Sequence, residues 1–280
     1  MLTRRNALAA PAVLAASRPR RRTRPILFGA NRLAWDAFRV AVPRAEVTRV
    51  YYHGVNRFPA EWPDGAVGAR AVVSFEPHPA DLLAGRLDSR LLAAAATAPH
   101  WSMIVPWYEA GPANPRRYPS WVTARHVQAC QRYLHRLLAP TNVRTGSVIC
   151  GPAADLHTWI APGLDWYGAD IDGDWFLKGG MFEVSRFERR QAANLAVWKQ
   201  KARSGRPRVV IAETNCGHDR YRAVWFAMLA AWHAEHEGAR LVTYWSEPGR
   251  VRQGTGTGPW ASASDQTTDI LRQLSELYRA

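Results

Sequence analysis

The sequence contains few of the residues that define disulfide-rich proteins and membrane-spanning proteins. Its 280 residues include only three cysteines, Cys130, Cys150 and Cys216, and no two of them stand in a CxxC spacing. An odd count without that spacing does not indicate a disulfide framework, although it leaves room for one bridge. Beyond the N-terminal segment, no stretch approaches the ~18 apolar residues of a membrane helix. We therefore expect no integral membrane span.

Common nucleotide-binding and metal-binding motifs are also absent. No GxGxxG or Walker-type loop follows the first candidate strand, which argues against a nucleotide-binding fold. No HxH or HExxH pair occurs, so a metal-dependent barrel hydrolase is only a further alternative. We expect neither a metal nor an organic cofactor. The residues on which the metal alternative rests are His53, His78, Glu76, Asp170, Asp172 and His218.

Lysine is scarce, and nearly all of the positive charge comes from arginine. The net charge is +14, but seven arginines fall in residues 1–25, where there is no acidic residue. The rest of the chain has 30 basic and 23 acidic residues, a net charge of +7. These basic residues are scattered along helical stretches, a pattern typical of a solvated face. We therefore expect no nucleic-acid partner.

The N-terminus has the composition of an export signal. Residues 1–17, MLTRRNALAAPAVLAAS, combine a charged start, an apolar run and a small-residue end. TRRNAL at 3–8 resembles the twin-arginine export signature. Residues 18–25, RPRRRTRP, are too charged and proline-rich to pack, and they predict a tether. The sequence thus predicts a signal peptide and a secreted or cell-surface protein; a basic amphipathic N-terminus is the alternative.

From residue 26 onward, short β-branched or aromatic runs alternate with helical patterns. This alternation favours parallel strands joined by crossover helices, and eight units predict a single-domain (β/α)8 TIM barrel over residues 26–280. The best helical patterns lie at 81–97, 120–138, 187–203, 220–237 and 264–279. The candidate strands are 26–29, 47–52, 70–75, 101–108, 143–149, 165–170, 208–212 and 240–245.

Active sites of such barrels lie at the carboxyl ends of the strands. Two of these ends carry glutamates, Glu109 after the fourth strand and Glu213 after the seventh. Strand alternation predicts that Val105, Trp107 and Glu109 share the inward face, and that Val209, Ile211 and Glu213 do likewise. Two carboxylates over an apolar barrel can differ in pKa, as glycosidic hydrolysis requires.

Several short motifs carry a family resemblance over most of residues 26–250. WYEAG at 107–111, VIAETN at 210–215 and TYW at 243–245 resemble clan A of the glycoside hydrolases, particularly its endo-β-mannanase-like branch. VVSFEPHPADLLAGRLDSRL at 72–91 and GLDWYGADID at 163–172 are similar to the third and sixth units of bacterial members. The resemblance implies that Glu109 is the acid/base, Glu213 the nucleophile and Trp245 a platform for the sugar ring.

Further residues near the strand ends are candidates for binding a carbohydrate substrate. Aromatic faces can stack on sugar rings, and for Trp175 and for Trp260 ordinary loop packing is an equal alternative. Asp170 and Asp172 are expected to bind sugar hydroxyls or to tie down the sixth loop, and His53 to be a ligand or a structural group. The predicted substrate-binding residues are Trp245, Trp107, Tyr108, Asp170, Asp172, His53, Asn31 and Trp175.

Together these features predict a retaining glycoside hydrolase acting on β-linked poly- or oligosaccharide. Clan members usually have Asn or His immediately before the acid/base, whereas Tyr108 stands there in this chain. That departure supports the alternative of a non-catalytic carbohydrate-binding or cell-surface barrel. In the simplest structural interpretation, Glu109 caps a helix near Ser120 and Glu213 accepts hydrogen bonds within its own turn. The sequence leaves the sugar, the mode of attack and the oligomeric state open.

Overall fold

The computed structural model describes eleven stretches of the chain, which include nearly all of the predicted strands. The predicted signal peptide, the tether, Trp245, Trp260 and His218 lie outside these residues, as does almost all of the predicted helix at 264–279. The division of the chain into signal peptide, tether and barrel therefore stays a prediction. The described residues are 27–31, 39–40, 42–43, 45–63, 70–111, 119–214, 216, 219–235, 239–244, 272–273 and 276.

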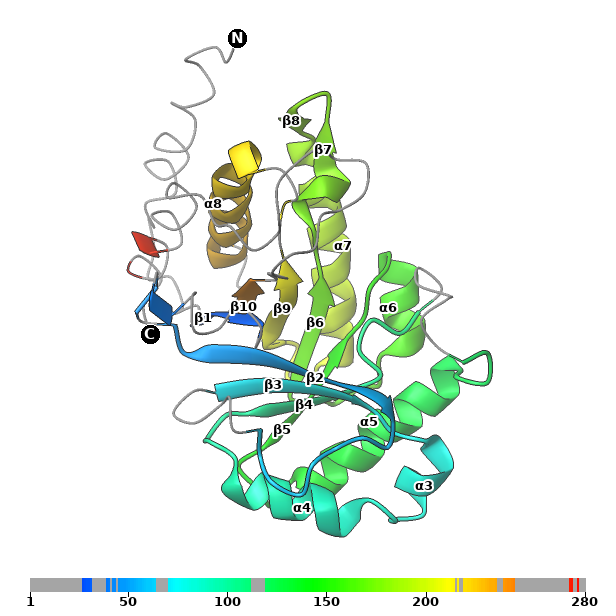
Figure 1. Ribbon diagram of the computed structural model, residues 1–280. Coiled ribbons are helices and arrows are strands. Elements are labelled where there is room, and N and C mark those ends of the chain that lie inside the picture. Colours follow the sequence, from blue (N-terminus) through cyan, green and yellow to red (C-terminus); the bar gives the residue numbers. More distant parts are fainter. Residues whose placement is uncertain are drawn as a thin grey trace.

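Eight parallel strands form a closed barrel (Figure 1), which confirms the predicted fold class. β1 closes it, because Gly29 pairs with Val47 of β2 on one side and with Thr243 of β10 on the other. Each strand lies within two residues of its predicted position at its amino end. The strands are β1 Leu27–Asn31, β2 Val47–Val55, β3 Arg70–Glu76, β4 Met103–Pro106, β5 Arg144–Val148, β6 Trp166–Asp170, β9 Val209–Thr214 and β10 Ala239–Tyr244.

From β3 onward, the described helices connect successive barrel strands and flank the barrel on its outside (Figure 1). α5 illustrates why they form: Thr123 Oγ1 accepts a hydrogen bond from the His126 amide at 3.3 Å and caps its first turn. Its apolar residues then recur on the face that covers the strands. The helices are α3 Pro79–Leu83, α4 Asp88–Thr97, α5 Ala124–Leu138, α6 Ala153–Trp159, α7 Val184–Lys201 and α8 Asp219–Glu235.

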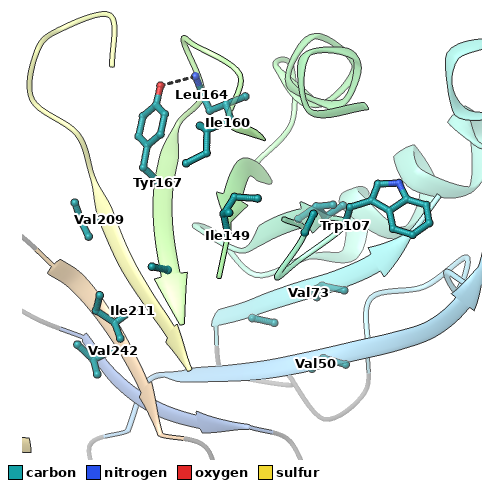
Figure 2. Close-up of a cluster of buried hydrophobic side chains, with 14 of the residues drawn as sticks. Val50, Val73, Trp107, Ile149, Ile160, Leu164, Tyr167, Val209, Ile211 and Val242 are labelled. Carbon is teal, nitrogen blue, oxygen red and sulfur yellow. Dashed lines mark hydrogen bonds between the residues drawn. The ribbon is translucent and has the colours of Figure 1, made fainter. Parts of the chain in front are cut away.

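Alternation along the strands produces two separate apolar clusters. The inner cluster fills the barrel, and every one of the eight strands contributes to it. The outer cluster lies between strands and helices, and several of its members are labelled in Figure 2. Neighbouring residues divide between the two, as Trp166 of β6 does from Tyr167. The inner cluster consists of Leu27, Val47, Val72, Met103, Val105, Tyr108, Val148, Trp166, Val210 and Leu241.

The helix expected at 81–97 is broken into α3 and α4. Gly85 has a φ of +75° and ends the first helical segment. The Arg86 amide then donates to the Asp81 carbonyl at 3.0 Å, and the Arg86 side chain bonds to the Asp81 carboxylate. The apolar periodicity continues through this break, so it does not reveal the interruption.

Three elements were not expected from the sequence. α6 is only seven residues long and follows Pro152. After β6, the 3₁₀ helix η3, Gly173–Phe176, leads into a two-stranded hairpin of β7, Leu177–Lys178, and β8, Met181–Phe182. Gly179 and Gly180 form its turn with φ values of +57° and +81°. These additions enlarge the loops at the carboxyl end of the barrel.

The described helices, from α3 to α8, have at most 18 residues. None of them combines the length and the hydropathy needed to cross a membrane.

Candidate active site

Glu109 lies in a left-handed turn at the carboxyl end of β4. Trp107 and Glu109 have φ values of +51° and +55°, a region that residues other than glycine seldom occupy. Two backbone hydrogen bonds hold the turn: the Trp107 amide donates to Phe75 of β3 at 3.0 Å, and the Glu109 amide donates to Val148 of β5 at 2.9 Å. Such backbone strain costs about 1 to 3 kcal/mol per residue and is concentrated at functional sites.

This turn corrects the predicted facing of the fourth strand. Val105 points into the barrel, as predicted, but Trp107 belongs to the outer cluster and Tyr108 to the inner one. The Trp107 indole is fully buried beside the Cys130 thiol of α5 and meets the Trp121 ring edge-on at 5.8 Å. Figure 2 shows it directed away from the barrel interior. Trp107 therefore supports the turn from outside, and no face of it is open to a sugar.

The charges of three carboxylates act on Cys150, which lies two residues beyond the end of β5. Burial and the negative charges of Asp170, Glu109 and Asp172 raise the pKa of the Cys150 thiol to about 12. Asp170 ends β6 and is buried, whereas Glu109 and Asp172 are half-buried. The structure thus brings predicted site residues from the fourth and sixth strand ends close together. We call this group the Cys150 cluster.

Arg190 of α7 braces the loops beside the Cys150 cluster. Its Nη2 donates to the Gly151 carbonyl at 3.0 Å, and its guanidinium lies 4.6 Å from the centre of the Trp175 ring. The positive charge also acts on the Cys150 thiol, partly opposing the carboxylates. Arg190 thus covers one face of the half-buried Trp175 indole, and the role of Trp175 in sugar binding stays a prediction.

β2 contributes an inward row of polar and aromatic side chains. Arg49 is fully buried, and its guanidinium lies 4.6 Å from the Tyr51 ring centre and 5.4 Å from that of Tyr108. The Tyr108 hydroxyl lies 3.1 Å from Nδ1 of His53, which is exposed at the end of the row. Tyr108, which the sequence marked as an unusual neighbour of Glu109, therefore belongs to the barrel interior.

The backbone of Glu213 lies at the carboxyl end of β9, in register with Asp170 of β6. The register shifts here, because the preceding β6 residue, Ala169, pairs with Ile211. Ile211 belongs to the outer cluster, and Thr214 accepts a hydrogen bond from Trp225 of α8 at 2.8 Å. Ile211 and Thr214 thus both face outward with two residues between them, whereas regular strand alternation would leave only one.

The predicted inward face of Val209 and Ile211 is wrong. Both belong to the outer cluster, and Val210 between them points into the barrel. The sequence pattern could not distinguish the two faces because all three residues are apolar and β-branched. Of the remaining predicted residues, Asn31 ends β1 with its backbone in register with Arg49 of β2.

One residue near the barrel mouth was missed by the sequence analysis. Trp121 lies in the loop between β4 and α5 and is 39% exposed. Its ring packs 5.0 Å from that of His78, which follows β3, and its carbonyl oxygen lies 2.8 Å from Nδ1 of His126. A tryptophan held from three sides yet partly open has the form of a stacking surface. Only its position after a strand end could have singled it out.

Within the stretches that the structure describes, no three His, Cys, Asp or Glu side chains gather as a metal site would require. The three cysteines, Cys130, Cys150 and Cys216, are free thiols.

No family model and no curated protein matches this sequence. Solved structures match its fold. A GH26 β-mannanase from Bacteroides ovatus aligns with a TM-score of 0.56 and 12% identity, over 99% of this chain and 98% of that one. GH26C from a Muricauda species aligns with a TM-score of 0.53 and 11% identity, over 99% and 94%. A β-D-glucuronidase from Dictyoglomus thermophilum aligns with a TM-score of 0.57 and 10% identity, over 90% and 50%. The resemblance to clan A glycoside hydrolases is confirmed at the level of the fold.

The Cys150 cluster predicts an unreactive thiol. At pH 8, a pKa of about 12 leaves so little thiolate that iodoacetamide should alkylate Cys150 at least about 1,000-fold more slowly than a free cysteine. Asp170→Asn removes the carboxylate whose charge acts most strongly on the Cys150 thiol, so it should lower this pKa and speed the alkylation. Asp88→Asn, on α4, is the matched control and should change nothing. Site-resolved mass spectrometry measures the rates, and alkylation of the wild-type thiol at the free-cysteine rate would contradict the cluster.

Proposed function

We propose that this protein is a glycosidase that hydrolyses β-linked poly- or oligosaccharides with retention of configuration. In this proposal Glu109 is the general acid/base and Glu213 is the nucleophile. The observation that carries it is that Glu109, Asp170 and Asp172 all act electrostatically on the Cys150 thiol at one end of the barrel, where the backbone of Glu213 is in register with Asp170. A retaining glycosidase built on this barrel uses two carboxyl groups that face each other across the scissile bond at the barrel mouth.

The reaction would proceed by two displacements. The Glu213 carboxylate attacks the anomeric carbon while Glu109 donates its proton to the departing glycosidic oxygen, which gives a glycosyl ester and a free alcohol. Glu109, now ionised, takes a proton from water as that water attacks the same carbon. The ester bond breaks, Glu213 leaves as carboxylate and Glu109 is protonated again. No cofactor is needed for these steps.

The other residues at the mouth would hold the sugar. Asp170 and Asp172 would accept hydrogen bonds from its hydroxyls, and Trp245 would stack on a ring, as the sequence resemblance implies. Trp121 is the better placed described indole for a second stacking contact, since Trp107 is buried and Trp175 is covered by Arg190. Two of the matched structures are a β-mannanase and a β-D-glucuronidase, so β-mannosides and β-glucuronides come first as test substrates.

A non-catalytic carbohydrate-binding barrel is the second candidate. Tyr108, immediately before Glu109, is the observation that favours it, because this tyrosine is buried inside the barrel and leaves Glu109 without the usual neighbour. Such a protein would bind oligosaccharides and release no product.

The central experiment compares the two carboxylates with a surface glutamate. Glu109→Gln and Glu213→Gln should each lower kcat at least about 1,000-fold on the best 4-nitrophenyl β-glycoside, because each removes a group acting in the transition state. Thermal unfolding should stay within a few degrees of the wild type. Glu46→Gln, which precedes β2 and pairs with Arg70, is the matched control and should retain full activity.

Azide separates the two roles. Added to Glu213→Ala, it should attack in place of the nucleophile and yield a glycosyl azide of inverted configuration, whereas with Glu109→Ala it should yield one of retained configuration. Full activity in either Gln variant would remove that residue from the mechanism. Oligosaccharide binding without turnover in the wild type would establish the second candidate.

We also infer that the chain is exported as a secreted or cell-surface protein through residues 1–17. The protein recovered from the culture medium should lack this segment by intact mass, and a full-length mass would contradict cleavage.

A further inference from the structure

Four side chains link the buried interior of the barrel to its mouth. Arg49, Tyr51 and His53 alternate along the inner face of β2, and Tyr108 reaches them from the turn after β4. The Tyr51 and Tyr108 ring centres are 4.8 Å apart, and that of His53 lies 6.1 Å and 6.2 Å from them. The two ends of this series differ in exposure, since Arg49 is fully buried and His53 is exposed.

The charge of Arg49 at the buried end favours Tyr108 as the donor in its hydrogen bond with His53. A guanidinium over an aromatic ring is attracted by its π electrons, and Arg49 lies within 5.4 Å of both tyrosine ring centres. Nearby positive charge stabilises negative charge on the phenolic oxygen, which strengthens the O–H group as a donor. Arg49 is itself fixed, because its Nη1 donates to the Val72 carbonyl of β3 at 3.3 Å.

The Tyr108 hydroxyl in turn decides the tautomer of His53. It lies 3.1 Å from Nδ1, so when it donates there, the neutral imidazole carries its proton on Nε2. Tyr108 is fully buried and cannot rotate away without leaving the inner cluster. His53 thereby presents one oriented N–H donor at the barrel mouth, next to a tyrosine that directly precedes Glu109 in the chain.

A donor at this place complements the groups of the Cys150 cluster. Glu109, Asp170 and Asp172 accept hydrogen bonds when ionised, whereas a sugar hydroxyl both donates and accepts. We propose that His53 binds the substrate by donating from Nε2 to one hydroxyl of the sugar ring at the scissile bond, and that Tyr108 is its positioning residue. This inference deepens the proposed function and rests on it.

The test uses four variants and the 4-nitrophenyl β-glycoside that the wild type hydrolyses fastest. His53→Ala and Tyr108→Phe should each lower kcat/KM about tenfold or more, the size of one lost hydrogen bond to substrate. His53→Gln, whose amide N–H reaches a similar position and needs no tautomer, should stay within about threefold of the wild type. Tyr108→Phe should then have no further effect in the His53→Gln background.

A matched control separates this effect from the general loss of a tyrosine hydroxyl. Tyr133→Phe removes a hydroxyl that bonds to Asp88 between two outer helices, so kcat/KM should be unchanged. Substrates lacking single hydroxyls provide the decisive readout. The loss caused by His53→Ala should vanish for the one deoxy substrate that lacks the contacted hydroxyl and persist for the others.

Outcomes that overturn the inference differ from those that overturn the proposed function. Equal losses on every deoxy substrate, or an undiminished Tyr108→Phe effect in the His53→Gln background, would assign the pair a purely structural role. Unchanged kinetics in His53→Ala would do the same while leaving the glycosidase intact. If the wild type binds sugar without turnover, the same variants are compared by their Kd for mannohexaose or the corresponding oligosaccharide. A wild type that neither hydrolyses nor binds any sugar overturns both proposals.

Discussion

Two backbone hydrogen bonds hold the turn on which the candidate site depends. They join Trp107 to Phe75 of β3 and Glu109 to Val148 of β5, so the chain stays attached to both neighbouring strands after β4 has ended. The positive φ values at Trp107 and Glu109 break the strand alternation. As a result Trp107 packs outward, Tyr108 enters the barrel and Glu109 stays at the mouth. Without this turn, Tyr108 could not reach His53.

Electrostatics at the mouth follow from the same arrangement. Asp170 is buried, Glu109 and Asp172 are half-buried, and the charges of all three raise the pKa of the Cys150 thiol. Arg190 opposes part of this charge and ties the loops together. The mouth of the barrel therefore carries both the carboxylates and the cation that partly offsets their effect on the thiol.

The sequence predicted the strands well because each is a short apolar run between polar strand ends, and parallel pairing buries both faces. The same uniformity hid which face points inward, so the facing of Trp107 and Ile211 was predicted incorrectly. The Trp107 error arises where a left-handed turn interrupts the alternation without a local sequence signal. Val209, Val210 and Ile211 alternate regularly, and their shared apolar character hid the inward face. The contact of Arg190 with Trp175 joins segments that are separated in the sequence, so the periodicity of apolar residues could not predict it.

The central claim is that Glu109 and Glu213 act on opposite sides of one glycosidic bond. The most direct measurement is the distance between their carboxyl groups in a crystal structure of the protein. A retaining mechanism predicts about 5 to 5.5 Å across an open cleft. A separation beyond about 10 Å would leave the two groups unable to share one anomeric carbon, and it would contradict the mechanism whatever the fold.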